Sequence, residues 1–198
     1  FVFLRPLGLR LEAASRGTRL RLVGAGTWLD AGRPVAAGAA LALAALRGIV
    51  DYVPGDLTRT ARAGTPANEI ARAAAAERQF LALDPFGDAA GTLGATVATA
   101  SAGPLAHAFG TPRDNVLGLA FAIGPRVVVR AGGRRLKNVA GFDLVRLLTG
   151  AWGTLGAITE VSVRLRALPD DDATVAAALP PARALDAWGA RLLGAPLA

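Results

Sequence analysis

The sequence contains no cysteine and no methionine, and it has a single histidine, His107. The absence of cysteine excludes disulfide bonds, thiolate metal sites and a cysteine nucleophile. One histidine is too few for a metal site built from several histidines. We therefore predict no metal site. We also find no pair of groups placed for general acid–base catalysis, so the catalytic residues remain unknown at this stage.

Charged residues are scarce, at 19%, while 53% of the residues are hydrophobic. This balance favours a folded core over disorder. The net charge is +7, but the basic residues are scattered, with Arg134 and Arg135 the densest spot, and aromatic residues are not interleaved with them. That pattern argues against nucleic-acid binding. Apolar stretches such as 35–46 are shorter than the roughly 20 residues that span a membrane, so we expect a cytoplasmic protein.

Hydrophobic spacing in the first half predicts strands and one helix. Residues 19–23 and 58–63 alternate polar and apolar side chains, as half-buried strands do. Pro66 suits the first turn of a helix and Thr65 suits its N-cap. We therefore predict a helix over 67–78.

The second half adds further elements, with predicted strands at 116–123, 126–130 and 158–165 and a predicted helix at 142–148. Gly124 and Pro125 predict a hairpin turn between the first two strands. The helical spacing predicts a buried face formed by Leu144, Leu147 and Leu148. The alternation of apolar and polar residues in 158–165 is interrupted once, by one extra polar residue.

Three glycine-rich segments lie beside these elements, at 24–27, 91–96 and 150–160. Glycine lets backbone N–H groups approach a phosphate without a Cβ in the way. None of them is the dinucleotide fingerprint in which a G-x-G-x-x-G opens a helix. A tight turn at 24–27 and a packed alanine helix at 92–102 remain the alternatives. We expect Gly94→Val to abolish phosphate binding and leave the fold largely intact.

A resemblance is carried by an ordered set of short segments: 32–35, 47–52, 60–66, 92–94, 101–104, Arg113-Asp114, 116–118, 137–143, Arg146-Leu147 and 153–156. In this order they resemble the FAD-binding domain of the vanillyl-alcohol oxidase (PCMH-type) flavoproteins. Within that superfamily they are most similar to the E subunits of glycolate oxidases. The segment Lys137-Asn138-Val139-Ala140-Gly141-Phe142-Asp143 is the most specific of the set.

The resemblance implies an α+β fold, a PCMH-type domain of two α/β lobes at about 1–83 and 84–167. The composition of the chain changes at 168–172, which contains a proline followed by three consecutive acidic residues. We therefore expect 168–198 to be a linker and the start of a truncated C-terminal domain.

The resemblance also implies an FAD site. The pyrophosphate would meet backbone N–H groups of 24–27 and 92–95, adenine would meet 156–158, and the flavin ring would face Gly103, Arg113, Lys137 and Asn138. The predicted cofactor-binding residues are Gly24, Ala25, Gly26, Thr27, Trp28, Pro85, Thr92, Leu93, Gly94, Ala95, Ala98, Gly103, Arg113, Asp114, Lys137, Asn138, Gly153, Gly156 and Ile158. Ala25 and Ala95 stand where the family usually carries consecutive glycines. With no cysteine, and with His107 away from any attachment position, we expect noncovalent FAD.

Three functions follow as hypotheses. The first is an FAD-dependent oxidoreductase subunit that acts on glycolate or another small 2-hydroxy acid. The second is a non-catalytic flavin subunit for electron transfer or assembly of the same complex. The third is a general anion- or nucleic-acid-binding module. The implied partners of the first two are a paralogous FAD-binding subunit and an iron–sulfur subunit, through which the chain would be peripheral to a membrane.

Lys137 is the only lysine in the chain, since every other basic side chain that carries a permanent charge is arginine. A surface lysine kept by chance is the alternative to a role beside the flavin. If the ammonium faces the ring, Lys137→Ala removes a charge worth about 1–3 kcal/mol to the anionic reduced flavin. We expect a lower flavin midpoint potential in Lys137→Ala and partial recovery in Lys137→Arg. An unchanged potential would identify a surface residue.

Overall fold

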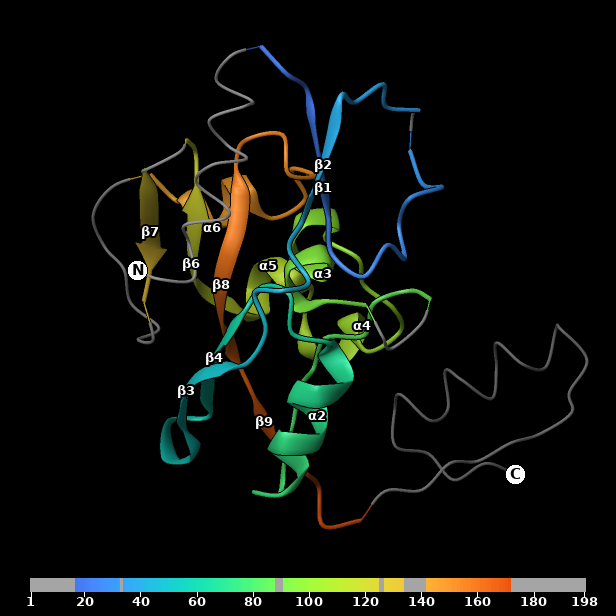
Figure 1. Ribbon diagram of the computed structural model, residues 1–198. Helices are drawn as coiled ribbons and strands as arrows, with labels where there is room; N and C mark the ends of the chain where they lie inside the picture. The colour runs from blue at the N-terminus through green and yellow to red at the C-terminus, as the bar shows by residue number, and fades with distance from the viewer. Residues whose placement is uncertain (1–16, 33, 88–90, 125–126, 134–141, 172–198) are drawn as a thin grey trace, which may run out of the picture. The chain divides into compact units, whose positions relative to one another are not determined.

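The computed structural model describes residues 17–32, 34–87, 91–124, 127–133 and 142–171. Residues up to Leu168 belong to one compact unit. Its centre is a five-stranded antiparallel sheet in the order β3 (Ile49–Val53), β4 (Thr58–Arg62), β8 (Ala157–Arg164), β6 (Val116–Ala122), β7 (Val128–Gly132) (Figure 1). The two predicted lobes thus contribute strands to the same sheet.

Two smaller sheets and several short helices surround this sheet. β1 (Leu20–Val23) pairs in parallel with β2 (Ala39–Ala42), and β5 (Gln79–Phe80) pairs antiparallel with β9 (Arg166–Ala167). The helices are η2 (Pro54–Asp56, a 3-10 turn), α2 (Ala67–Ala75), α3 (Leu93–Thr99), α4 (Ala106–Phe109), α5 (Pro112–Asn115) and α6 (Leu144–Leu148). The predicted mixed α+β class is confirmed. No helix in the described part of the chain is long and apolar enough to cross a membrane.

The hydrophobic core lies between the sheet and helices α2, α3 and α6. Ile70 and Ala74 come from α2, Leu93 and Val97 from α3, and all four are almost completely buried. The strands contribute the alternate residues that face these helices: Ala61, Val116, Leu119, Phe121, Ile158, Val161 and Val163. Since the helices are too short to be stable alone, this packing is what holds them in place.

The predicted strands are all observed, with small shifts at their ends, and β6 and β7 form the predicted hairpin, with Ala122 paired to Val128. Pro125, in its turn, lies outside the described residues. The extra polar residue that interrupts the alternation in β8 forms a β-bulge. Ala120 pairs with Glu160, whereas the next residue, Phe121, pairs with Ile158. The bulge shifts the alternation by one residue, so Ile158 and Val161 both face the core.

Two details of the helix predictions are wrong. Thr65 does not cap α2, whose N-cap position is Pro66. The hydroxyl of Thr65 instead accepts a hydrogen bond from the Gly48 N–H (2.9 Å) and donates to the Gly48 carbonyl (3.3 Å). A tertiary contact therefore uses the side chain that local sequence assigned to the helix.

The buried face of α6 is also different from the predicted one. Val145 and Leu148 are buried, while Leu147 is 56% exposed. The helix begins only at Leu144, after an Asp143 cap whose carboxylate accepts from the Arg146 N–H (3.0 Å). In so short a helix, residues three apart share the face toward the sheet, and Leu147 lies on another.

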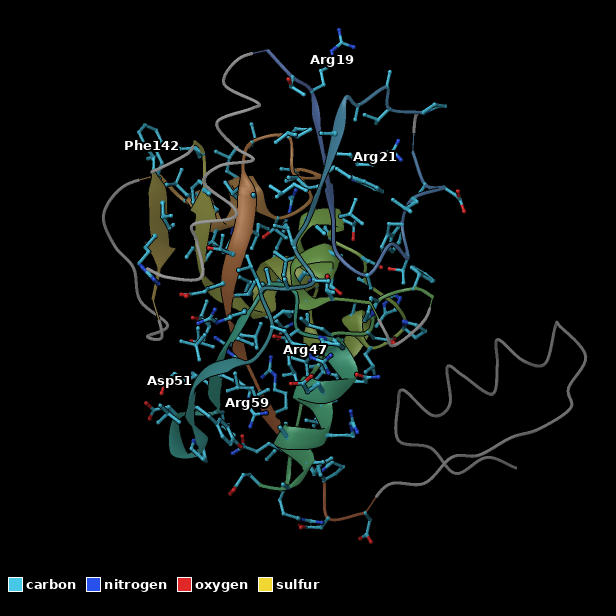
Figure 2. The ribbon with its side chains drawn as sticks, viewed as in Figure 1. Arg19, Arg21, Arg47, Asp51, Arg59 and Phe142 are labelled. Carbon is cyan, nitrogen blue, oxygen red and sulfur yellow. The ribbon has the colours of Figure 1, made fainter. Side chains whose placement is uncertain are left out.

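Arg59 is the largest charged side chain in the interior, with 2% of its surface exposed. Its guanidinium donates to the carbonyls of Ile70 and Ala73 of α2, each at 3.1 Å, and lies 3.7 Å from the centre of the Tyr52 ring. Figure 2 shows the side chain between β4 and α2. Ala73 belongs to the last turn of α2, where carbonyls have no donor inside the helix, so Arg59 satisfies one of these carbonyls.

We predict that Arg59→Met lowers the free energy of unfolding by about 3 kcal/mol, because it removes two charge-assisted hydrogen bonds and leaves the Ala73 carbonyl without a donor among the described residues. The matched control is Arg72→Met, on the exposed surface of α2, for which we expect a change within about 0.5 kcal/mol. Urea denaturation of the two variants measures the difference. Equal losses of unfolding free energy in the two variants would show that the buried Arg59 guanidinium contributes no more to stability than the exposed Arg72.

Candidate functional site

The three glycine-rich segments predicted from sequence meet at one cavity of about 280 Å³. Its wall combines the loop after β1, the beginning of α3 and the loop before β8. The predicted residues that line it are Gly24, Gly26, Thr27, Trp28, Thr92, Gly94, Ala95, Ala98, Gly153, Gly156 and Ile158. Segments separated by more than half the chain therefore build one site.

The loop after β1 presents unsatisfied backbone donors to this cavity. The parallel pair ends where the Val23 carbonyl accepts from the Leu43 N–H (2.7 Å). Beyond that point, the N–H groups of residues 24–27 have no hydrogen-bond acceptor among the described residues. Gly26 has φ +83°, a conformation that favours glycine. Successive free N–H groups in such a loop are suited to an anion.

The backbone N–H groups of segment 92–95 were predicted to bind the pyrophosphate, but they already have acceptors within the protein. The N–H of Leu93 donates to the Thr65 carbonyl (2.9 Å), and that of Gly94 donates to the Ala63 carbonyl (2.7 Å). The N–H of Ala95 donates to the Thr92 hydroxyl, which caps α3. These donors are used by the protein itself, so this segment lines the cavity with side chains. It is also the short helix that the alternative interpretation proposed.

Gly94 is required by packing. A Cβ at this position would lie 2.6 Å from the Cβ and 2.9 Å from the carbonyl oxygen of Ala63. The expectation that Gly94→Val leaves the fold intact is therefore wrong, because α3 could not approach the end of β4. Gly24 has a similar role on the other side, since its Cβ would collide with the Thr92 hydroxyl.

The loop before β8 rests on the end of α3. The N–H groups of Gly150 and Trp152 donate to the Val97 and Ala98 carbonyls, at 3.0 and 2.8 Å. Gly153 has φ +74°, and a Cβ there would lie 2.8 Å from Leu22 of β1. This close approach joins the loop to the β1–β2 pair and closes one side of the cavity.

The other predicted residues that the structure describes are not part of the cavity lining. Leu93 is buried in the core, and Ala25 is exposed and is not part of the lining. Pro85 belongs to a loop that lies against Gly103, whose Cβ position is 2.7 Å from the Asp84 carbonyl oxygen. Arg113 is exposed, with its guanidinium nitrogen 3.8 Å from the Cβ position of Gly150. Lys137 and Asn138 lie outside the described residues.

Asp114 has a local structural role. Its carboxylate accepts from both the N–H and the hydroxyl of Thr111, each at 2.8 Å, at the start of α5. The hydroxyl of Thr111, followed by its N–H, holds the pKa of Asp114 below its ordinary value. These hydrogen bonds to Thr111 explain this residue without a ligand.

The electrostatics of the cavity favour an anion. Among the described residues, its lining contains no aspartate or glutamate, and the one charged residue there is Arg21, labelled in Figure 2. The guanidinium of Arg21 donates to the Val35 carbonyl (2.9 Å). No cluster of potential metal ligands is found among the described residues.

Sequence reasoning missed the apolar side of the cavity. The lining residues it did not name are Leu20, Arg21, Leu22, Val23, Leu29, Ala31, Val35, Leu43, Ala63, Thr99, Trp152 and Thr154. Trp28 and Trp152 meet there edge to face, with ring centres 6.0 Å apart and planes at 88°. The sequence did contain a signal for Trp152, because a large aromatic residue inside a glycine-rich segment is unusual and could have been predicted to line the site.

Comparison with known proteins agrees with this geometry. A family profile described as "FAD binding domain" matches residues 11–133. Glycolate oxidase subunit GlcE of Escherichia coli is 41% identical over 160 residues, which are 80% of this chain and 45% of that protein. Glycolate oxidase subunit GlcD of Bacillus subtilis is 33% identical over 155 residues, 78% of this chain and 33% of that protein. The chain spans less than half the length of these relatives.

A solved structure shares the fold. An alkyldihydroxyacetonephosphate synthase superposes with a TM-score of 0.67 at 18% identity, over 83% of this chain and 30% of that protein. At this identity the likeness concerns the fold alone. The two relatives at higher identity are both named as subunits, so the chain resembles components of multisubunit enzymes.

We predict a pH-dependent effect of Asp114→Asn. Because the folded-state pKa of Asp114 is lowered, its stabilisation is present above the unfolded-state pKa and is lost as the pH falls through the folded-state pKa. Asp114→Asn should therefore destabilise the protein by about 0.5 kcal/mol at neutral pH, a small value because the carboxylate is exposed to solvent, and the two proteins should converge in strong acid, where the carboxylate is protonated in both the folded and the unfolded state. Denaturant titrations at both pH values test this. The neutral-pH difference should shrink in a Thr111→Val background, and a difference that persists in acid would contradict the assignment.

Proposed function

Because this chain belongs to the FAD binding domain family, whose profile matches residues 11–133, we propose that it holds FAD noncovalently as a subunit of an oxidoreductase acting on a small 2-hydroxy acid. One observation carries the site assignment. The N–H groups of residues 24–27 have no acceptor among the described residues, and the loop that bears them lines the cavity. When bound, FAD supplies a hydride acceptor.

The cavity fits the phosphate end of such a ligand. A pyrophosphate needs several donors and no competing carboxylate. Residues 24–27 provide the backbone donors, Arg21 provides the positive charge, and the lining has no acidic residue. The segment 92–95 contributes through Thr92 and Ala95, since the N–H groups of Leu93, Gly94 and Ala95 are already bonded.

The size of the cavity indicates that only part of FAD enters it. Pockets for drug-sized ligands measure about 300–1,000 Å³, and this one is about 280 Å³. FAD is larger than such ligands and binds in an extended form in our proposal. The remainder would extend past the lining residues toward the positions predicted for the flavin ring, Gly103, Arg113, Lys137 and Asn138.

The attachment is noncovalent in this proposal. Cysteine is absent from the sequence. His107 is exposed on α4 and is not part of the cavity lining. Acid precipitation of the yellow protein should therefore release all of the flavin into the supernatant.

A second candidate function is electron transfer or assembly without substrate chemistry in this chain. It is favoured by the described part of the lining, in which Arg21 is the only ionisable residue. Arginine stays protonated and cannot serve as a general base. The groups that act on the substrate would then come from outside the described residues or from another subunit.

The partners we propose are a paralogous FAD-binding subunit and an iron–sulfur subunit. The names of the two glycolate oxidase relatives as subunits support an assembly of this kind. The cytoplasmic location expected from the sequence, with peripheral membrane contact through the partners, stays a prediction.

The proposed site is tested by Gly26→Ala in the full-length protein. A Cβ at φ +83° forces the loop to change conformation and disperses its N–H groups. We expect FAD affinity to fall by about tenfold or more, measured as flavin per chain and by titration of the apoprotein with FAD.

The matched control is Gly48→Ala. Gly48 also has a positive φ, +119°, with open space at its Cβ position, but it does not line the cavity. It should lose stability to a similar degree and keep its FAD. Equal flavin content in the two variants would refute the phosphate site, and a full-length parent protein without a visible flavin band would refute the function.

A further inference from the structure

Trp152 has a backbone conformation that a bulky residue seldom adopts. Its φ is +54°, in the left-handed region. Its neighbours with positive φ, Gly150 and Gly153, are both glycine. Such a residue stores strain, and strained residues are concentrated at functional sites. Among the described non-glycine residues with positive φ, Trp152 is the one that lines the cavity.

The loop imposes this conformation on whatever residue stands there. The N–H groups of Gly150 and Trp152 are fixed to carbonyls of α3, and the Thr154 hydroxyl donates to the Ala151 carbonyl (2.6 Å). A glycine at position 152 would accept the same backbone without strain. The backbone therefore does not require tryptophan, and the reason for it lies in the indole.

The indole is placed at an open, apolar part of the cavity wall. It is 49% exposed and meets the Trp28 ring edge to face. Leu29 and Val35 line the same cavity and are each about half exposed. Exposed apolar side chains gathered at the wall of a cavity indicate a ligand group that covers them, and flat aromatic rings are covered best by another flat ring.

We propose that one face of the Trp152 indole stacks the adenine ring of the bound dinucleotide, with Trp28 holding that indole in place edge to face and Trp152 acting as a specificity-determining residue. This rests on the proposed function and assigns a chemical role to two residues of the same site. Trp28 directly follows the N–H groups of residues 24–27. In FAD, adenine is joined to the pyrophosphate through a compact ribose, whereas the flavin ring is separated from it by an open ribityl chain. A ring stacked so near the phosphate donors in a small cavity is therefore adenine.

The test uses the full-length apoprotein and three probes, FAD, ADP and FMN, titrated by calorimetry. The key variant is Trp152→Asn, because asparagine tolerates the left-handed conformation. We expect ADP to bind about tenfold or more weakly than to the parent, on the scale of one lost base–aromatic stack. The melting temperature should stay equal or rise, because strain is relieved. A residue that only supported the fold would lower both.

Two variants control for the backbone and for folding. Ala100→Gly relieves the same kind of strain, at φ +52°, outside the cavity lining, and should leave ADP affinity unchanged. Trp152→Phe keeps an aromatic ring and should retain ADP affinity within a few-fold, so it decides the question if Trp152→Asn does not fold.

The outcomes separate the adenine stack from the proposed function. Unchanged ADP affinity in Trp152→Asn, with FAD still bound by the parent, overturns the stack alone. Loss of FMN affinity without loss of ADP affinity overturns the adenine assignment. A parent that binds neither FAD nor ADP overturns the proposed function and the stack together.

Discussion

The site depends on the close contact between the beginning of α3 and the end of β4. The Gly94 N–H donates to the Ala63 carbonyl at 2.7 Å, and the missing side chain at Gly94 lets the two backbones approach. On one side this contact presents Thr92 to the loop after β1. On the other, the end of α3 carries the loop that contains Trp152. If α3 moved away from β4, both walls of the cavity would separate.

Local pattern was sufficient for the elements it predicted, which are β1, β4, β6, β7, β8, α2 and α6, and for the cavity's glycine-rich half. The alternation at 58–63 and 158–165 matches β4 and β8, because each central strand alternates between the helical layer and the other face of the sheet. The glycine-rich segments around Gly26, Gly94 and Gly153 were predicted as one site, and all three line one cavity. Glycine was informative because it marks where backbones must approach closely or turn with positive φ.

Contacts between distant segments could not be read from the sequence. Thr65 is a residue type that often caps helices, yet its hydroxyl forms hydrogen bonds with the backbone of Gly48. Only the fold brings these two residues together. Gly94 was assigned to a ligand, although Ala63 explains it. The apolar half of the cavity, which includes Leu29 and Val35, was missed for a related reason. An alternating pattern tells which residues are buried, but it does not identify the residues that face them.

The pairing of β4 with β8 has a consequence for when the protein can acquire its cofactor. Thr60 and Ser162 join these neighbouring strands by their hydroxyls, 2.8 Å apart, although they are 102 residues apart in the chain. Closing so long a loop is entropically costly and slow compared with forming local structure. The loop that completes the cavity immediately precedes β8, so the cavity is complete only after β8 has paired with β4 across this long separation. Flavin binding would then follow this long-range pairing and could not guide it.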